Sequence, residues 1–152
     1  MIYLLLMWIG ASPGSTGGGI KTTVIAVAFL NLKSIILGRE RTEFAKVQIG
    51  GNSIQRAFAI ILLSLVVLGV TVLVLSINEP DKQLFALAFE AFSAFGTVGL
   101  TLGVTPDLSV TSKIFLSLVM LTGRVGTLTL LYALVTPAKP IYYQYPREEV
   151  SL

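Results

Sequence analysis

The sequence contains no cysteine and no histidine among its 152 residues. Their absence excludes disulfide bonds, thiol nucleophiles, the common zinc sites and every catalytic triad that depends on histidine. Charged residues are also scarce, at 12% of the chain against about 25% in an average soluble domain. Apolar residues instead make up 54% of the chain. This composition excludes an ordinary soluble domain and indicates an integral membrane protein.

The apolar residues fall into four stretches separated by short polar segments. The second stretch, residues 57–77, is uncharged, and as a helix it would rise about 31 Å, enough to cross a hydrocarbon core of about 30 Å. The first, residues 2–32, is interrupted at its centre by a glycine-rich run. The fourth, residues 114–135, is long enough to cross but carries Arg124. The third, residues 84–102, holds about twelve residues before two glycines, which is too short a helix to cross.

The basic residues orient these stretches in a membrane. Five of the eleven basic residues lie in one connecting segment: Lys33, Arg39, Arg41, Lys46 and Arg56. Basic loops stay on the cytoplasmic side, so we expect this segment, and the tail after residue 137, to be cytoplasmic. The second stretch then ends outside and the fourth begins outside, which makes the third a re-entrant loop. We therefore expect an all-α integral membrane fold of the span, pore helix and span type.

The expected organisation has four parts. Residues 1–32 form a broken transmembrane helix with a glycine-rich loop, and residues 33–56 form the cytoplasmic loop. Residues 57–136 form the span–pore–span repeat, and residues 137–152 form a cytoplasmic tail. The basic residues adjoin apolar spans and are not interleaved with aromatic residues, so we expect a lipid bilayer, and no nucleic acid, as a partner.

The run from Phe95 to Thr101, after the expected pore helix, is the first candidate site. Non-helical backbone at membrane depth is tolerated where it is buried or lines water, and its unpaired carbonyl groups can replace the hydration shell of an ion. Gly99 permits backbone angles that turn successive carbonyls to one side. The alternative is a plain re-entrant turn that conducts nothing. Within the pore helix, we expect Glu90 to anchor that helix by hydrogen bonds rather than to bind an ion.

Arg124 is the second candidate. An arginine at the middle of a spanning helix costs roughly 2.5–3.5 kcal/mol on insertion scales, so it must face protein or water. Gly123 and Gly126 flank it and allow another backbone to approach closely. Two interpretations stay open: a structural ion pair or carbonyl cap, and a positive charge that gates or restrains a cation path.

The glycine-rich run from Ala11 to Lys21 is the third candidate, and it superficially matches a phosphate-binding loop. The match fails because Ile20 stands where that motif needs a glycine before the lysine, and because no strand–helix context surrounds it. A helix interrupted by glycines within the membrane is typical of a flexible gate. The alternative is an inert kink that packs through its small residues.

Together these motifs resemble the Trk/Ktr/HKT superfamily of cation transporters, and most of all the bacterial Ktr and Trk potassium uptake membrane subunits. Residues 10–22 are similar to the intramembrane gating loop of that family. Residues 89–101 resemble its fourth pore helix and filter, residues 123–126 the arginine motif of its last helix, and residues 145–149 its C-terminal tail. By this resemblance the chain is a C-terminal fragment that holds the last span of the third repeat and all of the fourth.

The resemblance implies a pore-forming subunit of the cell (inner) membrane that takes up potassium, or potassium and sodium. No cofactor is implied beyond the transported ion. The implied filter residues are Thr97, Val98, Gly99 and Leu100. The implied gate residues are Gly14, Ser15, Thr16, Gly17, Gly18, Gly19 and Arg124.

The implied partners are the repeats that this chain lacks, a second copy in a homodimer, and a cytosolic nucleotide-binding regulatory ring. The alternative is a non-conducting truncated or structural membrane fragment, because one filter loop cannot surround an ion. An enzyme is not expected, since Lys21, Glu90 and Arg124 have no nucleophile–base partner at a readable spacing.

Overall fold

The computed structural model describes residues 2–12, 14–38, 43–44 and 47–126, so the tail 137–152 and the end of the fourth stretch lie outside the described residues. The described helices are α1 (Ile2–Trp8), α2 (Thr22–Ile36), α3 (Gly51–Asn78), α4 (Leu84–Gly96), the short 3-10 helix η1 (Thr105–Asp107) and α5 (Val110–Val125). A small antiparallel hairpin joins β1 (Glu43–Phe44) to β2 (Val47–Gln48). The architecture is therefore helical, as the composition predicts, and the hairpin is a feature that the all-α expectation did not include.

Helix α3 is long and apolar enough to cross a membrane, judged by its length and composition. Its 28 residues would rise about 42 Å, which exceeds a hydrocarbon core of about 30 Å. The expected apolar stretch 57–77 lies inside this helix, and the helix continues at its N-terminal end through polar residues 51–56. Helix α2 likewise extends beyond the expected boundary to Ile36. Helical hydrogen bonding continues past the apolar run because it satisfies the backbone in water as well as in the membrane, so the thickness of the membrane does not set where the helix ends.

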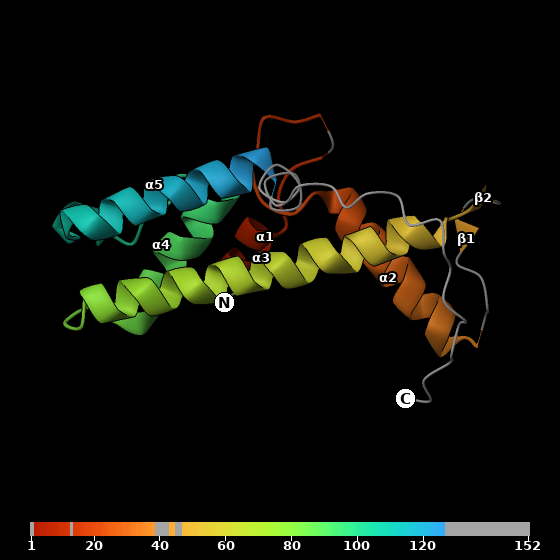
Figure 1. Cartoon of the computed structure of the whole chain (residues 1–152), viewed down its shortest axis with the longest axis horizontal. Helices are drawn as coiled ribbons and strands as arrows, with labels where there is room; N and C mark the ends of the chain where they lie inside the picture. Colours follow the sequence, from red (N-terminus) through yellow and green to blue (C-terminus); the bar gives the residue numbers. More distant parts are fainter. Residues whose placement is uncertain (1, 13, 39–42, 45–46, 127–152) are drawn as a thin grey trace, which may run out of the picture.

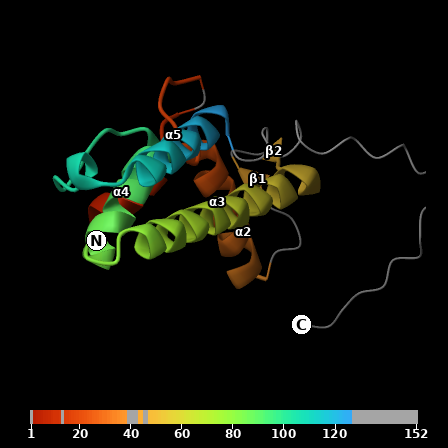
Figure 2. The ribbon, with the colours of Figure 1, turned by 60° about the vertical axis from the view of Figure 1, so that its left-hand side comes forward.

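Helix α4 lies at the centre of the molecule, where it packs against α1, α3 and α5 (Figures 1 and 2). Most of its residues are buried: Ala86, Leu87, Phe89, Glu90, Ala91, Ser93, Ala94, Phe95 and Gly96. Small residues at its contact surfaces let neighbouring backbones approach closely. This burial explains how a short helix can be the shared packing partner of α1, α3 and α5.

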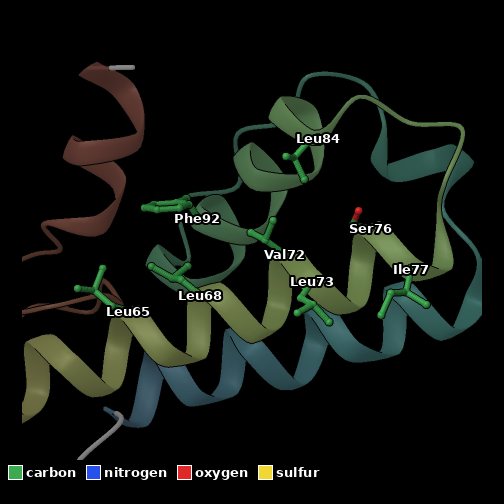
Figure 3. A pocket seen from close by; sticks show the side chains of 9 residues that line it. Leu65, Leu68, Val72, Leu73, Ser76, Ile77, Leu84 and Phe92 are labelled. Carbon is green, nitrogen blue, oxygen red and sulfur yellow. The ribbon is translucent and has the colours of Figure 1, made fainter.

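Large apolar side chains nevertheless remain exposed along α3, including Leu62 at 64% and Leu73 at 58%. An apolar groove of about 490 Å³ runs between α3 and α4 (Figure 3). It is lined by Leu65, Leu68, Gly69, Val72, Leu73, Ser76, Ile77, Leu84 and Phe92. Contiguous exposed apolar surface of this kind marks a contact with lipid or with further protein.

Candidate functional site

Helix α4 ends at Gly96 in a left-handed cap, and the chain then continues without helical structure. The amide of Thr97 donates to the carbonyl of Ala94, and the amide of Val98 donates to the carbonyl of Ser93, both at 3.0 Å. This pair of bonds is the Schellman pattern, in which glycine normally takes the left-handed position. Here Thr97 takes it, with φ of 51°. A side chain in this conformation costs roughly 1–2 kcal/mol, and such strain often accompanies function.

The segment that follows, residues 98–103, contains two glycines with left-handed backbone angles. Gly99 has φ of 81° and Gly103 has φ of 84°. A β-carbon added at either position would meet no atom within 4 Å. Both glycines are therefore required by the backbone angle and not by a lack of space.

Glu90 ties this segment back to α4. Its Oε1 accepts hydrogen bonds from the Thr101 hydroxyl and from the Leu102 amide, the latter at 3.2 Å. Its Oε2 accepts a hydrogen bond of 2.7 Å from the Thr105 hydroxyl. The carboxylate is 5% exposed, so these donors replace the water that a charged group would otherwise keep. The sequence-based expectation that Glu90 anchors by hydrogen bonds is confirmed, although its partners lie beyond the helix rather than within it.

The glycine-rich loop between α1 and α2 closes on itself. The amide of Gly10 donates to the carbonyl of Ile20 at 2.7 Å, and the amide of Ile20 donates to the carbonyl of Trp8 at 3.2 Å. In Figure 1 the loop rises as an arch from the point where its two ends are hydrogen-bonded to each other. Because the ends are hydrogen-bonded to each other, residues 11–12 and 14–19 form a lobe between α1 and α2.

Three elements meet at the base of this lobe. The amide of Gly18 donates to the Thr97 hydroxyl at 2.8 Å, which joins the lobe to the end of α4. The amide of Gly19 donates to the carbonyl of Gly123 at 3.3 Å, which joins it to α5. The Arg124 guanidinium donates through Nη1 to the carbonyl of Thr16. We call this meeting point of the lobe, the end of α4 and the end of α5 the junction.

Glycines make the junction possible because the backbones there are nearly in contact. A β-carbon on Gly123 would lie 1.9 Å from the carbonyl oxygen of Phe95, and one on Gly10 would lie 2.0 Å from that of Gly18. A β-carbon on Gly18 would lie 2.8 Å from the Thr97 hydroxyl oxygen. A side chain at Gly10 or Gly123 would displace backbone, and one at Gly18 would displace the Thr97 side chain that its amide contacts.

A small cavity of about 150 Å³ lies within the junction. It is bordered by the lobe, by the ends of α4 and α5, and by one residue each of α2 and α3: Ser15, Gly17, Gly19, Ile20, Lys21, Val24, Ile60, Phe95, Gly123, Arg124, Val125 and Gly126. Its walls include backbone polar groups and two cationic residues, so the space is suited to water or an anion more than to a bare cation.

A second hydrogen-bonded cluster joins the far ends of α3 and α5. The carboxylate of Glu79 accepts from the Ser109 amide at 2.7 Å and from the Ser112 hydroxyl at 3.0 Å. The Ser109 hydroxyl caps α5 by accepting from the Ser112 amide at 3.3 Å. The backbone hydrogen bond from Ser109 is the main cause that lowers the pKa of the Glu79 carboxyl below its ordinary value. This cluster fixes where α5 begins relative to α3.

The structure brings some of the predicted residues together and leaves others apart. Thr97 and Arg124 both contact the lobe at the junction. Gly14 and Ser15 lie on the exposed part of the lobe, and Val98, Gly99 and Leu100 are exposed in the segment beyond the cap. The predicted filter and gate residues are thus joined through their nearest members, Thr97 and Gly18.

Two contacts of this region escaped sequence reasoning. The Trp8 indole donates to the Ser64 hydroxyl at 3.1 Å, which fixes the end of α1 against the middle of α3. Glu79 likewise caps α5 from a distance of thirty residues along the chain. Neither pair has a local spacing signal, because each depends on how the helices pack.

Comparison with known proteins matches residues 1–140 to the TrkH family, described as cation transport proteins. The chain is 36% identical over 157 residues to the potassium/sodium uptake protein NtpJ of Enterococcus hirae, across 100% of this chain and 35% of that protein. It is 38% identical over 147 residues to the Ktr system potassium uptake protein D of Bacillus subtilis, across 97% of this chain and 32% of that protein.

A further relative is the Ktr system potassium uptake protein B of Vibrio alginolyticus. The identity is 38% over 153 residues, across 99% of this chain and 32% of that protein. The chain therefore spans about a third of the length of these curated relatives.

Proposed function

Because this chain belongs to the TrkH family of cation transport proteins, we propose that it forms part of the pore of a transporter that takes up potassium, or potassium and sodium. The printed names of its relatives support this substrate class. The family and these relatives are ion transporters and not enzymes. The observation that carries the proposal is the junction, where a non-helical segment, a glycine-rich lobe and an arginine meet.

In this proposal α3 and the apolar stretch of residues 114–135, which begins within α5, cross the membrane, and α4 enters and leaves on one side. The 13 residues of α4 would rise about 20 Å, too little to cross a core of about 30 Å. The basic connection between α2 and α3, within residues 33–56, faces the cytoplasm together with the C-terminal tail. The first two helices, α1 and α2, are the halves of a broken span, and the lobe lies between them.

The proposed filter consists of the backbone carbonyls of Thr97, Val98, Gly99 and Leu100. Support comes from the left-handed angles at Thr97 and Gly99, since such angles stop a helix and release carbonyls from helical hydrogen bonding. Released carbonyls at membrane depth can replace the water around a cation. The C-terminal end of α4 adds a partial negative charge beside this segment, which favours a cation.

The proposed gate is the lobe, residues 14–19, held by Arg124. Gly18 contacts the first filter residue directly, so the lobe lies against one end of the proposed filter. The guanidinium adds a positive charge at that end, which raises the energy of a cation there. Opening would require the lobe to leave Thr97, and the glycines at residues 17–19 permit the necessary change of backbone angles.

One such segment cannot surround an ion, so the proposed pore needs repeats beyond this chain. We propose that the complete transporter consists of this chain joined to those repeats, that it pairs as a homodimer, and that a cytosolic nucleotide-binding ring regulates it. Relatives named as members of a Ktr system support an assembly of several components. The competing function is a non-conducting structural fragment, which the exposed apolar residues Val98 and Leu100 equally permit.

Growth of potassium-uptake-deficient cells tests the proposal. The complete transporter should restore growth at low external potassium, and Gly99→Ser should weaken that rescue because a side chain at φ of 81° displaces the filter backbone. The matched control is Gly38→Ser, just after α2, where φ is 63° and the space around the β-carbon is equally free.

The control separates loss of an ion site from general backbone strain, because only Gly99 lies within the proposed filter. Rescue that fails equally in both variants would indicate strain alone. Absence of rescue by the unaltered transporter, with the protein present in the membrane, would favour the non-conducting function.

A further inference from the structure

Glu90 is a buried carboxylate whose role goes beyond the helix that contains it. It lies in the middle of α4 and is 5% exposed. All three of its described hydrogen bonds reach the segment after that helix: the Thr101 hydroxyl, the Leu102 amide and the Thr105 hydroxyl. The oxygens of the carboxylate thus accept hydrogen bonds from the chain that follows α4 and not from α4 itself.

These bonds complete the anchoring of the segment between α4 and η1. At one end, the cap bonds of Thr97 and Val98 attach the segment to the last turn of α4. At the other end, Glu90 attaches Thr101 and Leu102 to the middle of the same helix. The backbone of residues 98–100 is therefore held at both ends, by the helix cap on one side and by Glu90 on the other. The side chains of these residues are exposed.

We propose that Glu90 is the positioning residue that sets the backbone of Thr97–Leu100 and thereby the preference of the pore for potassium over sodium. This inference rests on the proposed function of that segment as a filter. Glu90 acts through Thr101, Leu102 and Thr105, whose hydrogen bonds occupy its oxygens, and it does not coordinate the ion itself. We call the hydrogen bonds from Thr101, Leu102 and Thr105 to Glu90 the far anchor. Loss of the far anchor would let the backbone of the segment relax, and the pore would then distinguish less well between ions that differ only in radius.

The hydrogen-bond inventory predicts that an uncharged amide can replace the carboxylate. Each threonine has one hydroxyl proton, and in the present arrangement Thr101 and Thr105 both donate to Glu90. Their oxygens lie 3.0 Å apart. In Glu90→Gln the amide nitrogen can donate to Thr105, whose proton then turns to Thr101. Thr101 still donates to the amide oxygen, so every partner remains satisfied.

The test is uptake of radioactive rubidium by the complete transporter, with inhibition by sodium as the measure of selectivity. Glu90→Ala removes the far anchor and should lower the preference for rubidium by about tenfold, as expected when a hydrogen bond to a charged group is lost. Glu90→Gln should keep a preference close to that of the unaltered protein. The matched control is Leu87→Ala, which weakens the same buried helix without touching the anchor.

An unchanged preference in Glu90→Ala overturns the inference, and so does either of the next two outcomes. If Glu90→Gln behaves like Glu90→Ala, the charge acts on the ion directly. If Leu87→Ala lowers the preference as much as Glu90→Ala, the effect is general loss of stability. If Glu90→Ala does not accumulate, Thr105→Val removes one of the three donors and should give a partial loss of preference, and an unchanged preference would overturn the inference. Gly99→Ser is measured alongside: if it leaves selectivity intact, the proposed filter fails rather than the role of Glu90.

Discussion

Arg124, at the end of α5, supplies both a hydrogen bond to the lobe and a positive charge near it. Its guanidinium donates to the carbonyl of Thr16, which restrains the lobe, and its charge lies beside the proposed path of a cation. The sequence left two interpretations of Arg124 open: a structural ion pair or carbonyl cap, and a positive charge that gates a cation path. The geometry identifies a carbonyl partner, and that partner is in the lobe itself. In the proposed function this carbonyl cap would restrain the gate, and the flux through an Arg124 variant separates that role from a structural one.

Replacement of Arg124 by alanine should raise potassium flux through the complete transporter. The lobe would lose its hydrogen bond to a charged group, a loss that shifts an equilibrium by about tenfold or more, and the repelling charge would disappear. Flux is measured as rubidium uptake per molecule of transporter in the membrane.

The matched control for this prediction is Lys113→Ala on the same helix. Lys113 also donates to a backbone carbonyl, that of Pro106 in η1 at 2.8 Å, but it lies near the opposite end of α5. Its removal should leave flux unchanged. Unchanged flux in Arg124→Ala would leave this arginine a structural role alone.

Thr97 shows where sequence reasoning stops at the residue scale. A glycine is the usual residue at a left-handed helix end, and the glycines of the 96–99 run were the natural candidates. Threonine takes the position instead, and its hydroxyl accepts the Gly18 amide from an element 79 residues away. A contact at such separation leaves no periodic pattern in the sequence, so it cannot be predicted from spacing.

At the scale of elements, the packing of α5 against α4 depends on Gly123. The Phe95 carbonyl occupies the space where a β-carbon would stand, 1.9 Å away. Close backbone approach through small residues is a common way to pack helices in membranes. The lobe bonds to the same glycine through its carbonyl, so a displacement of α5 would also move the lobe.

Replacement of Gly123 by alanine should destabilise the transporter by about 1–3 kcal/mol, because the added methyl group forces α5 away from α4. Gly69→Ala is the matched control, since Gly69 also lies inside a helix but has nothing within 4 Å of its β-carbon position. That control should be neutral or stabilising by up to about 1 kcal/mol. Thermal unfolding of the purified complete transporter measures both, and equal midpoints would contradict the packing described for α5.

The bounds of α4 followed from its sequence more closely than those of the other helices. Its apolar run begins at Leu84, and glycine follows directly after Phe95, so both ends have local signals. The ends of α2 and α3 were placed at the limits of the apolar runs, and both helices extend past those limits, α2 to Ile36 and α3 from Gly51 to Asn78. The β1–β2 hairpin was not predicted, because strands of two residues have too few positions to show a period.

At the scale of the whole molecule, the described residues leave apolar surfaces open among themselves. The groove between α3 and α4 (Figure 3) and the half-exposed side chains of Val98, Leu100 and Leu102 all lie open. The relatives are about three times as long as this chain. These observations support an assembly in which lipid and further repeats cover the open surfaces. Composition alone predicted the membrane class, but the surfaces themselves emerged only once the helices were placed.

The central claim is that the segment after α4 forms part of a filter that distinguishes potassium from sodium. The most direct measurement is the reversal potential of the complete transporter, purified into a planar bilayer with potassium on one side and sodium on the other. Gly99→Ser should move the reversal potential toward zero, while Gly38→Ser, which also replaces a glycine of positive φ with open space around its β-carbon position, should leave it in place. An identical reversal potential in the unaltered protein and in Gly99→Ser would contradict the claim.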